Sequence, residues 1–176
     1  MTTLPIIIAP DPRLKVKCTR IDKVDAEIAT LMADMLDTMY LAPGIGLAAP
    51  QVGVTKRVIV ADASGKDDDR HPIKMANPKL LSVSDELWAY EEGCLSLPDH
   101  YAEVERPTRI CVGYIDENNE PQELEAEELL ATCIQHEMDH LEGTLFVDHI
   151  SALKRNMILR KLVKLKKLKA NDAAAE

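Results

Sequence analysis

The sequence has few aromatic residues and no long apolar run. Its 176 residues include one Trp, one Phe and four Tyr, although 46% of all residues are hydrophobic. We therefore expect a single domain whose core consists mainly of Leu, Ile, Val, Met and Ala. No apolar stretch approaches the ~18 residues of a membrane-spanning helix, and the N-terminal segment lacks the basic start of a signal peptide. We expect a cytoplasmic protein with no membrane partner.

The sequence also lacks closely spaced cysteine pairs. Its four cysteines, Cys18, Cys94, Cys111 and Cys133, form no C-x-x-C motif. In a reducing compartment such cysteines are free thiols or metal ligands rather than disulfides.

Positive charge is scarce except at one end of the chain. The net charge of −9 argues against a protein that binds specific DNA sites. Residues 154–176 nevertheless hold eight of the 21 Lys and Arg residues and two of the 30 Asp and Glu residues, a net charge of +6, whereas residues 1–153 carry −15. This asymmetry predicts an acidic body, residues 1–150, and a basic C-terminal helix and tail, residues 151–176, within one domain.

The hydrophobic pattern predicts three helices and a series of strands. Apolar residues recur at helical spacing over 25–40, 128–143 and 151–170. Alternating or β-branched segments predict strands at 57–62, 74–84, 86–98, 101–107, 109–116 and 121–127. This order indicates an α+β fold, with antiparallel sheets around a central buried helix and a C-terminal amphipathic helix. The apolar side of the C-terminal helix would contain Leu153, Met157, Leu162, Leu165 and Leu168.

The second predicted helix contains an H-E-x-x-H motif within QHEMDHLEG (135–143). His136 and His140 are about one helical turn apart, so both imidazoles can bind one ion. Glu137 can then act as general base on a water without binding the metal. Apolar residues on nearly all sides of this helix predict that it is buried, where two neutral histidines need polar partners. The motif therefore favours a central metal-binding helix over two surface histidines.

A catalytic site of this kind needs a third protein ligand. The extended metalloprotease pattern would place a His six residues after the second His, but that residue is Phe146, and His149 follows three residues too late. Asp148 is the remaining downstream candidate. Upstream, Cys94 follows Gly93, and a glycine lets the backbone approach a metal closely. Spacing alone does not distinguish a Cys94 ligand from a buried cysteine that only packs.

Three motifs taken together resemble those of peptide deformylases. They are GIGLAAPQ (44–51), EGCLS (92–96) and QHEMDHLEG (135–143), in this order and spacing. The resemblance extends from about Leu4 to the basic C-terminal segment. It implies a hydrolase, acting on a linear amide C–N bond, that removes the formyl group from N-formylmethionyl nascent peptides and releases formate. Residues 1–150 would form its catalytic part.

The resemblance also implies the metal site. Its ligands would be Cys94, His136 and His140, with Glu137 as the general base. The family typically uses Fe²⁺, and Ni²⁺, Co²⁺ or Zn²⁺ can substitute. A thiolate with two imidazoles suits divalent ions of this softness.

The same resemblance implies the contacts with the substrate. The side-chain amide of Gln51 and the backbone N–H of Leu95 would bind the oxyanion of the tetrahedral intermediate. Tyr90 stands where we expect an aliphatic pocket residue, and Glu92 and Arg106 are candidates for an ion pair that supports the site. The remaining substrate contacts, to an extended peptide and its methionine side chain, would come from Gly46, Gly93, Ile45, Leu129 and Cys133.

Two other classes of protein remain open at this point. A metalloprotease with Asp148 as third ligand would keep its metal without Cys94. A non-catalytic, ribosome-associated metal-binding module would need no general base at Glu137. The basic C-terminal helix is in addition a candidate contact with the anionic RNA of the ribosome.

Overall fold

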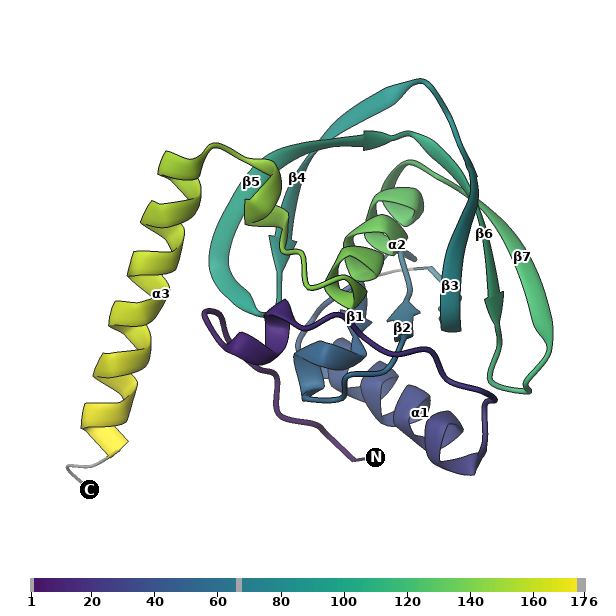
Figure 1. Ribbon diagram of the computed structural model, residues 1–176, viewed down its shortest axis with the longest axis horizontal. Helices are drawn as coiled ribbons and strands as arrows, with labels where there is room; N and C mark the ends of the chain where they lie inside the picture. The colour runs from purple at the N-terminus through teal and green to yellow at the C-terminus, as the bar shows by residue number, and fades with distance from the viewer. Residues whose placement is uncertain (1, 66–67, 174–176) are drawn as a thin grey trace.

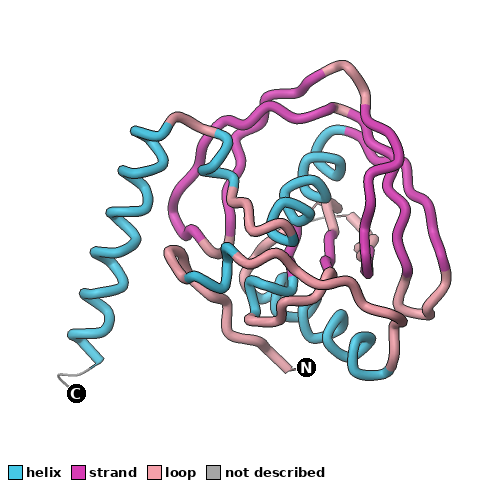
Figure 2. The backbone as a smooth tube through the Cα atoms, viewed as in Figure 1, coloured by secondary structure: helices cyan, strands magenta, loops and turns pink. Residues whose placement is uncertain are grey.

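The computed structural model describes residues 2–65 and 68–173. Two antiparallel sheets curve around a central helix, as Figures 1 and 2 show. The α+β fold predicted from the sequence is confirmed. The larger sheet has the strand order β1 (Gly46–Ala48), β2 (Val58–Ala61), β3 (Ile73–Val83), β6 (Arg109–Ile115) and β7 (Pro121–Glu127). The smaller sheet pairs β4 (Leu87–Cys94) with β5 (Leu97–Pro107).

Helix α1 (Ala26–Leu41) covers part of the larger sheet. It begins after Asp25, whose side chain accepts a hydrogen bond from the Ile28 N–H at 3.0 Å. This N-cap satisfies one of the free N–H groups of the first turn. Its buried residues recur every three or four positions and pack against residues of β1 and β2; they are Ile28, Met32, Met35 and Met39.

Helix α2 (Glu128–Leu141) is the central buried helix. Nine of its 14 residues are buried. No side chain caps its N-terminus, so packing rather than capping determines where it starts. The chain leaves the helix through Gly143, which has φ +74°. A Cβ there would lie 2.6 Å from the Lys15 carbonyl oxygen, so both the conformation and the close approach require glycine.

The segment predicted as one broken strand, residues 86–98, belongs to two strands. β4 ends at Cys94, the chain turns, and β5 starts at Leu97. Pro98 lies within β5, and a two-stranded ribbon tolerates a proline because few of its N–H groups are needed for pairing. This turn places Cys94 at the end of a strand that faces α2.

Helix α3 (Ala152–Ala173) follows a short 3-10 helix, η3 (Phe146–His149), and lies at one side of the body (Figure 1). The apolar side predicted for this helix is largely exposed. Of its five residues only Leu162 is buried; Leu153, Met157, Leu165 and Leu168 are 37–74% exposed. The helix instead packs with Leu162 and the partly buried Ile158 and Leu159. Residues 174–176 of the predicted tail lie outside the described residues.

None of the helices within residues 2–65 and 68–173 combines the length and hydrophobicity needed to span a bilayer.

Candidate active site

Three potential metal ligands from distant parts of the chain lie together. Cys94 ends β4, and His136 and His140 lie one turn apart on α2. One ligand atom from each residue lies within 4.8 Å of the others, and Cys94 Sγ is 3.3 Å from His140 Nε2. In a tetrahedral site with ordinary metal–sulfur and metal–nitrogen bonds, these two atoms would be about 3.6 Å apart. The three side chains therefore fit a single divalent ion.

The orientation of His136 is fixed by a buried carboxylate. Glu92 Oε2 lies 2.8 Å from His136 Nδ1, which leaves Nε2 for a metal. Arg106 binds the same carboxylate through two N–H groups, at 2.5 and 3.0 Å. The predicted Glu92–Arg106 pair is present, and the two side chains are 3% and 6% exposed. A carboxylate behind a ligating histidine fixes its tautomer and ring orientation.

The pKa shifts of His136 and His140 favour a single positive charge on this pair of side chains. Burial would lower the pKa of His136, but the hydrogen bonds with Cys94 and Glu92 raise it well above the usual range. Burial, together with the charge of His136, lowers the pKa of His140 well below its usual range. The pair thus accommodates one positive charge beside a thiol and a carboxylate. A cation bound between these side chains would satisfy the same preference.

Glu137 points into the site without a partner of its own. It is 4% exposed, and its Oε2 atom has no hydrogen-bond partner among the described residues. Burial raises the pKa of this carboxyl to about 7. An acid with a pKa near neutrality can both accept and return a proton at physiological pH.

Gln51 is held beside the thiol of Cys94. Its Oε1 atom accepts a hydrogen bond from the Ala48 N–H at 2.8 Å, so its Nε2 atom faces the other way. That amide donates to Ser96 Oγ at 3.1 Å and lies 3.5 Å from Cys94 Sγ. Leu95, the other predicted oxyanion donor, is in the turn between Cys94 and Ser96, and it lines a cavity beside these residues.

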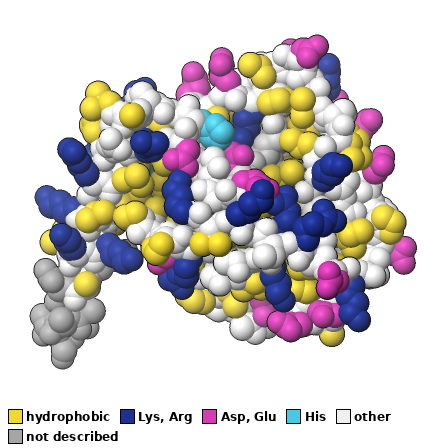
Figure 3. Space-filling view, viewed as in Figure 1, with side chains coloured by type: hydrophobic (Ala, Val, Ile, Leu, Met, Phe, Trp, Pro, Cys, Tyr) yellow, Lys and Arg dark blue, Asp and Glu magenta, His cyan; other side chains and the backbone are white. Residues whose placement is uncertain are grey.

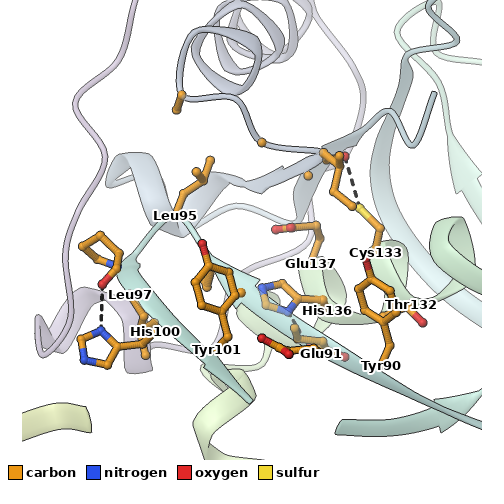
Figure 4. A pocket seen from close by; sticks show the side chains of 18 of the residues that line it. Tyr90, Glu91, Leu95, Leu97, His100, Tyr101, Thr132, Cys133, His136 and Glu137 are labelled. Atoms are coloured by element: carbon orange, nitrogen blue, oxygen red, sulfur yellow. Dashed lines mark hydrogen bonds and ion pairs between the residues drawn. The ribbon is translucent and has the colours of Figure 1, made fainter. Parts of the chain in front are cut away.

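A cavity of about 530 Å³ opens beside these residues. Its size is in the range that accepts a small peptide or drug-sized molecule. The five residues predicted to contact the substrate all line it: Ile45, Gly46, Gly93, Leu129 and Cys133. Figure 4 shows His136, Glu137 and Cys133 projecting from α2 toward this space.

Cys133 contributes an uncharged wall of this cavity. Its thiol donates to the Ile45 carbonyl at 3.3 Å, and burial raises its pKa well above the usual value. All four cysteines are free of disulfides, as the sequence predicted. Only Cys94 takes part in the ligand cluster found among the described residues.

Thr132 and Tyr101 line the cavity although the sequence did not predict them there. Tyr90, whose role was open, lies beside Cys133 and Thr132 in the view of Figure 4, and Tyr101 lies nearer Leu95. Tyr101 faces Gly93 across the β4–β5 ladder. The sequence predicted a strand at 101–107, but no local signal shows which strand pairs with it or which face meets the site.

Asp148 takes no part in the ligand cluster. Its Oδ2 atom accepts hydrogen bonds from the Leu145 N–H at 2.8 Å and from Lys15. His149 instead contacts Asp139. The geometry therefore does not support a site with Asp148 as third ligand.

Comparisons with known proteins agree with these observations. The polypeptide deformylase family model matches residues 3–156. Peptide deformylases of Agrobacterium fabrum and Rhizobium meliloti are each 52% identical to this chain, over 96% and 98% of its length and 99% of theirs. The crystal structure of peptide deformylase from Ehrlichia chaffeensis has a TM-score of 0.91 at 38% identity, covering 96% of this chain and 99% of that one. Its complex with actinonin has a TM-score of 0.89 at 39% identity, covering 93% and 98%.

Proposed function

This chain belongs to the polypeptide deformylase family, a family of metal-dependent hydrolases that remove the formyl group from nascent peptides, and we propose which of its residues perform that reaction. Cys94, His136 and His140 hold the metal, Glu137 is the general base, and Gln51 and Leu95 bind the oxyanion. The observation that carries this assignment is the approach of the Cys94 thiol to both imidazoles beside an unpartnered, buried carboxylate. Neither a protease nor a non-catalytic module is supported by the comparisons.

A bound divalent ion would supply Lewis acidity, which polarises the formyl carbonyl and lowers the pKa of water. The protein residues supply the remaining steps. Glu137 takes a proton from the attacking water and delivers it to the departing amine, for which a pKa of about 7 is well matched. The Gln51 amide and the Leu95 N–H stabilise the negative charge that develops on the formyl oxygen. The C–N bond then breaks, and formate and a free amino terminus are the products.

The cavity explains how a methionine side chain would be accommodated. Ile45, Leu129 and Cys133 present apolar surface, and the neutral thiol of Cys133 adds no charge to it. The strand edge at Gly93 and the backbone at Gly46 border the same cavity, so an extended peptide would lie between them and pair by β-augmentation. The substrate class is N-formylmethionyl peptides, and a cytoplasmic location is proposed because an enzyme of nascent chains works where those chains are made.

The assignment is tested with a formyl-methionyl tripeptide. The purified chain should release formate. Cys94→Ala should lose both metal and turnover, and Glu137→Gln should keep its metal and lose turnover. Cys111→Ala, in strand β6 outside the ligand cluster, is the matched control and should behave like the unmodified chain. Retention of stoichiometric metal by Cys94→Ala would contradict the ligand set.

We further propose Fe²⁺ as the metal in cells. A thiolate and two imidazoles suit this ion as well as Ni²⁺, Co²⁺ or Zn²⁺. Cys94 is only half-buried, so oxygen can reach the ligand and the ion. The Fe²⁺ form should therefore lose activity in air much faster than a Ni²⁺-substituted preparation. Equal lifetimes of the two preparations would count against an iron–thiolate site.

The basic C-terminal helix is proposed to contact the ribosome. Lys and Arg side chains gather over α3 in Figure 3, and Lys161, Lys164 and Lys167 are exposed. The rest of the protein is acidic, so RNA would be attracted to α3 and repelled by the remaining surface. Residues 151–176 are assigned to the same domain as residues 1–150, because Leu162 is fully buried against that part of the chain.

A further inference from the structure

Behind the proposed metal site, a chain of charged contacts runs from His136 to the surface. Beyond Glu92 and Arg106, the Arg106 Nη1 group donates to Asp139 Oδ2 at 2.9 Å. His149 Nε2 donates to the same oxygen at 2.7 Å. Exposure rises along this chain, from 3% for the Glu92 side chain to 26% for Asp139 and 38% for His149. Asp139 therefore has two donors, one buried and one at the surface.

The same short helix reaches His136 by a second route. Phe146, at the start of η3, is 1% exposed, and its ring stacks on the His136 imidazole with a centroid distance of 6.2 Å and an interplanar angle of 23°. This separation is within the range of favourable aromatic pairs. His149 ends η3. The two ends of one helical turn thus act on one metal ligand, by ring contact and through the Asp139–Arg106–Glu92 chain.

We propose that η3 is the positioning element of the metal site, with Phe146 and His149 as positioning residues for His136. This inference rests on the proposed metal ligands. Phe146 limits tilting of the imidazole plane, since a tilted ring would collide with a fully packed neighbour. His149 holds Asp139, Asp139 holds the Arg106 guanidinium, and the guanidinium fixes the carboxylate that binds His136 Nδ1. Removing one partner loosens the next, because each buried group then lacks a hydrogen bond that it had.

If η3 only stabilised the fold, any substitution that loosens it would affect the metal site. Asp148 distinguishes this possibility from a specific positioning role of His149. Asp148 lies in η3 beside His149, caps the Leu145 N–H and pairs with Lys15. Its carboxylate contacts neither His136 nor Asp139. Asp148→Asn therefore loosens η3 without breaking the chain to His136, which makes it the matched control for His149.

The experiment uses the full chain loaded with Co²⁺, whose visible spectrum reports ligand geometry, and measures cobalt loss to a chelator together with thermal melting. His149→Leu should lose cobalt roughly tenfold faster than the unmodified chain and shift the spectrum, as expected for a supporting contact of a metal ligand. His149→Gln, whose amide can still donate to Asp139, should restore most of the retention. Phe146→Leu should shift the spectrum as well. Asp148→Asn should lower the melting temperature and leave both cobalt readouts unchanged.

Two outcomes would overturn the proposal. The first is an unchanged spectrum and rate of cobalt loss in His149→Leu, which would leave His149 with a role in stability only. The second is an Asp148→Asn variant that loses cobalt as fast as His149→Leu, since the effect would then come from a loosened helix. Failure of the metal assignment itself would look different, because Cys94→Ala would then bind cobalt as well as the unmodified chain.

Discussion

The side-chain amide of Gln51 is held by contacts at both its oxygen and its nitrogen. Its carbonyl oxygen is occupied by the Ala48 N–H, so the amide nitrogen is the end directed toward Ser96 and Cys94. An amide that could flip would present an acceptor half of the time and repel an oxyanion. The buried, two-sided anchoring of Gln51 is therefore the feature that suits it to bind developing negative charge.

Replacing Gln51 should separate metal binding from turnover. Gln51→Leu removes the donor and should lower kcat by ~10²–10³-fold, whereas metal content should stay at one ion per chain. Gln51→Glu keeps the acceptor for Ala48 but replaces the amide donor with a buried carboxylate oxygen beside Cys94, so it should lose turnover as well. Formate release and metal analysis of the two variants check this. A Gln51→Leu enzyme with unchanged kcat would remove Gln51 from the catalytic residues.

Gly46 is required because side chains of α2 approach it closely. A Cβ at this position would lie 2.4 Å from Glu137 Oε1 and 2.7 Å from Cys133 Sγ. Gly46→Ala should therefore displace the Glu137 carboxylate and lower turnover by roughly 10²-fold, as a misplacement of about 1 Å does. Gly113→Ala is a suitable control, because its Cβ would meet only the Leu81 side chain, at 3.2 Å. Steady-state kinetics and metal content of both variants test this prediction. A Gly46→Ala enzyme that has also lost its metal would show that the loss of turnover has another origin.

Among the elements, the helix that carries the site and the C-terminal helix are held in different ways. α2 is surrounded by strands and 3-10 helices, so it stays buried without a side-chain N-cap. α3 packs on the body through Leu162, Ile158 and Leu159, and its other large apolar residues are exposed. The attachment of α3 therefore depends on very few side chains, of which Leu162 is the fully buried one.

Truncation of Leu162 should destabilise the protein far more than truncation of an exposed leucine of the same helix. Leu162→Ala leaves a cavity in the buried cluster that also contains Leu14 and Phe146, and should lower the free energy of unfolding by about 2–5 kcal/mol. Leu153→Ala, at a residue that is 74% exposed, should change it by less than about 0.5 kcal/mol. Urea denaturation of the two variants makes the comparison. Similar effects of both substitutions would show that α3 does not dock through Leu162.

For the whole molecule, the distribution of charge determines how it would meet a ribosome. The triple variant Lys161→Glu/Lys164→Glu/Lys167→Glu should abolish salt-sensitive ribosome binding and leave turnover of a small formyl peptide unchanged, because these side chains are exposed on α3. Arg20→Glu/Lys23→Glu/Lys79→Glu makes the same change in net charge on the body and should bind as before. Co-sedimentation at several salt concentrations distinguishes the two variants. Equal loss of binding in both would show that net charge, and not α3, governs the contact.

The sequence by itself determined the features that depend on neighbours along the chain. The helix predicted over 25–40, the burial of the second helix, and the pairing of His136 with His140 all follow from local spacing, because a helix places residues four apart on one face. The three motifs, matched together, also indicated the family. Each of these statements needs only the chain within a few turns of the residues concerned.

Only the tertiary structure decided which distant residues meet. Cys94 reaches the histidines because β4 ends against α2, and Tyr101 reaches the cavity because the register of β4 and β5 places it opposite Gly93. The outward face of α3 and the contacts of Phe146 and His149 behind His136 belong to the same class. Spacing along the chain contains no information on such contacts, because they are fixed by how strands and helices pack to bury their apolar faces, and many residues far apart in sequence compete for each place.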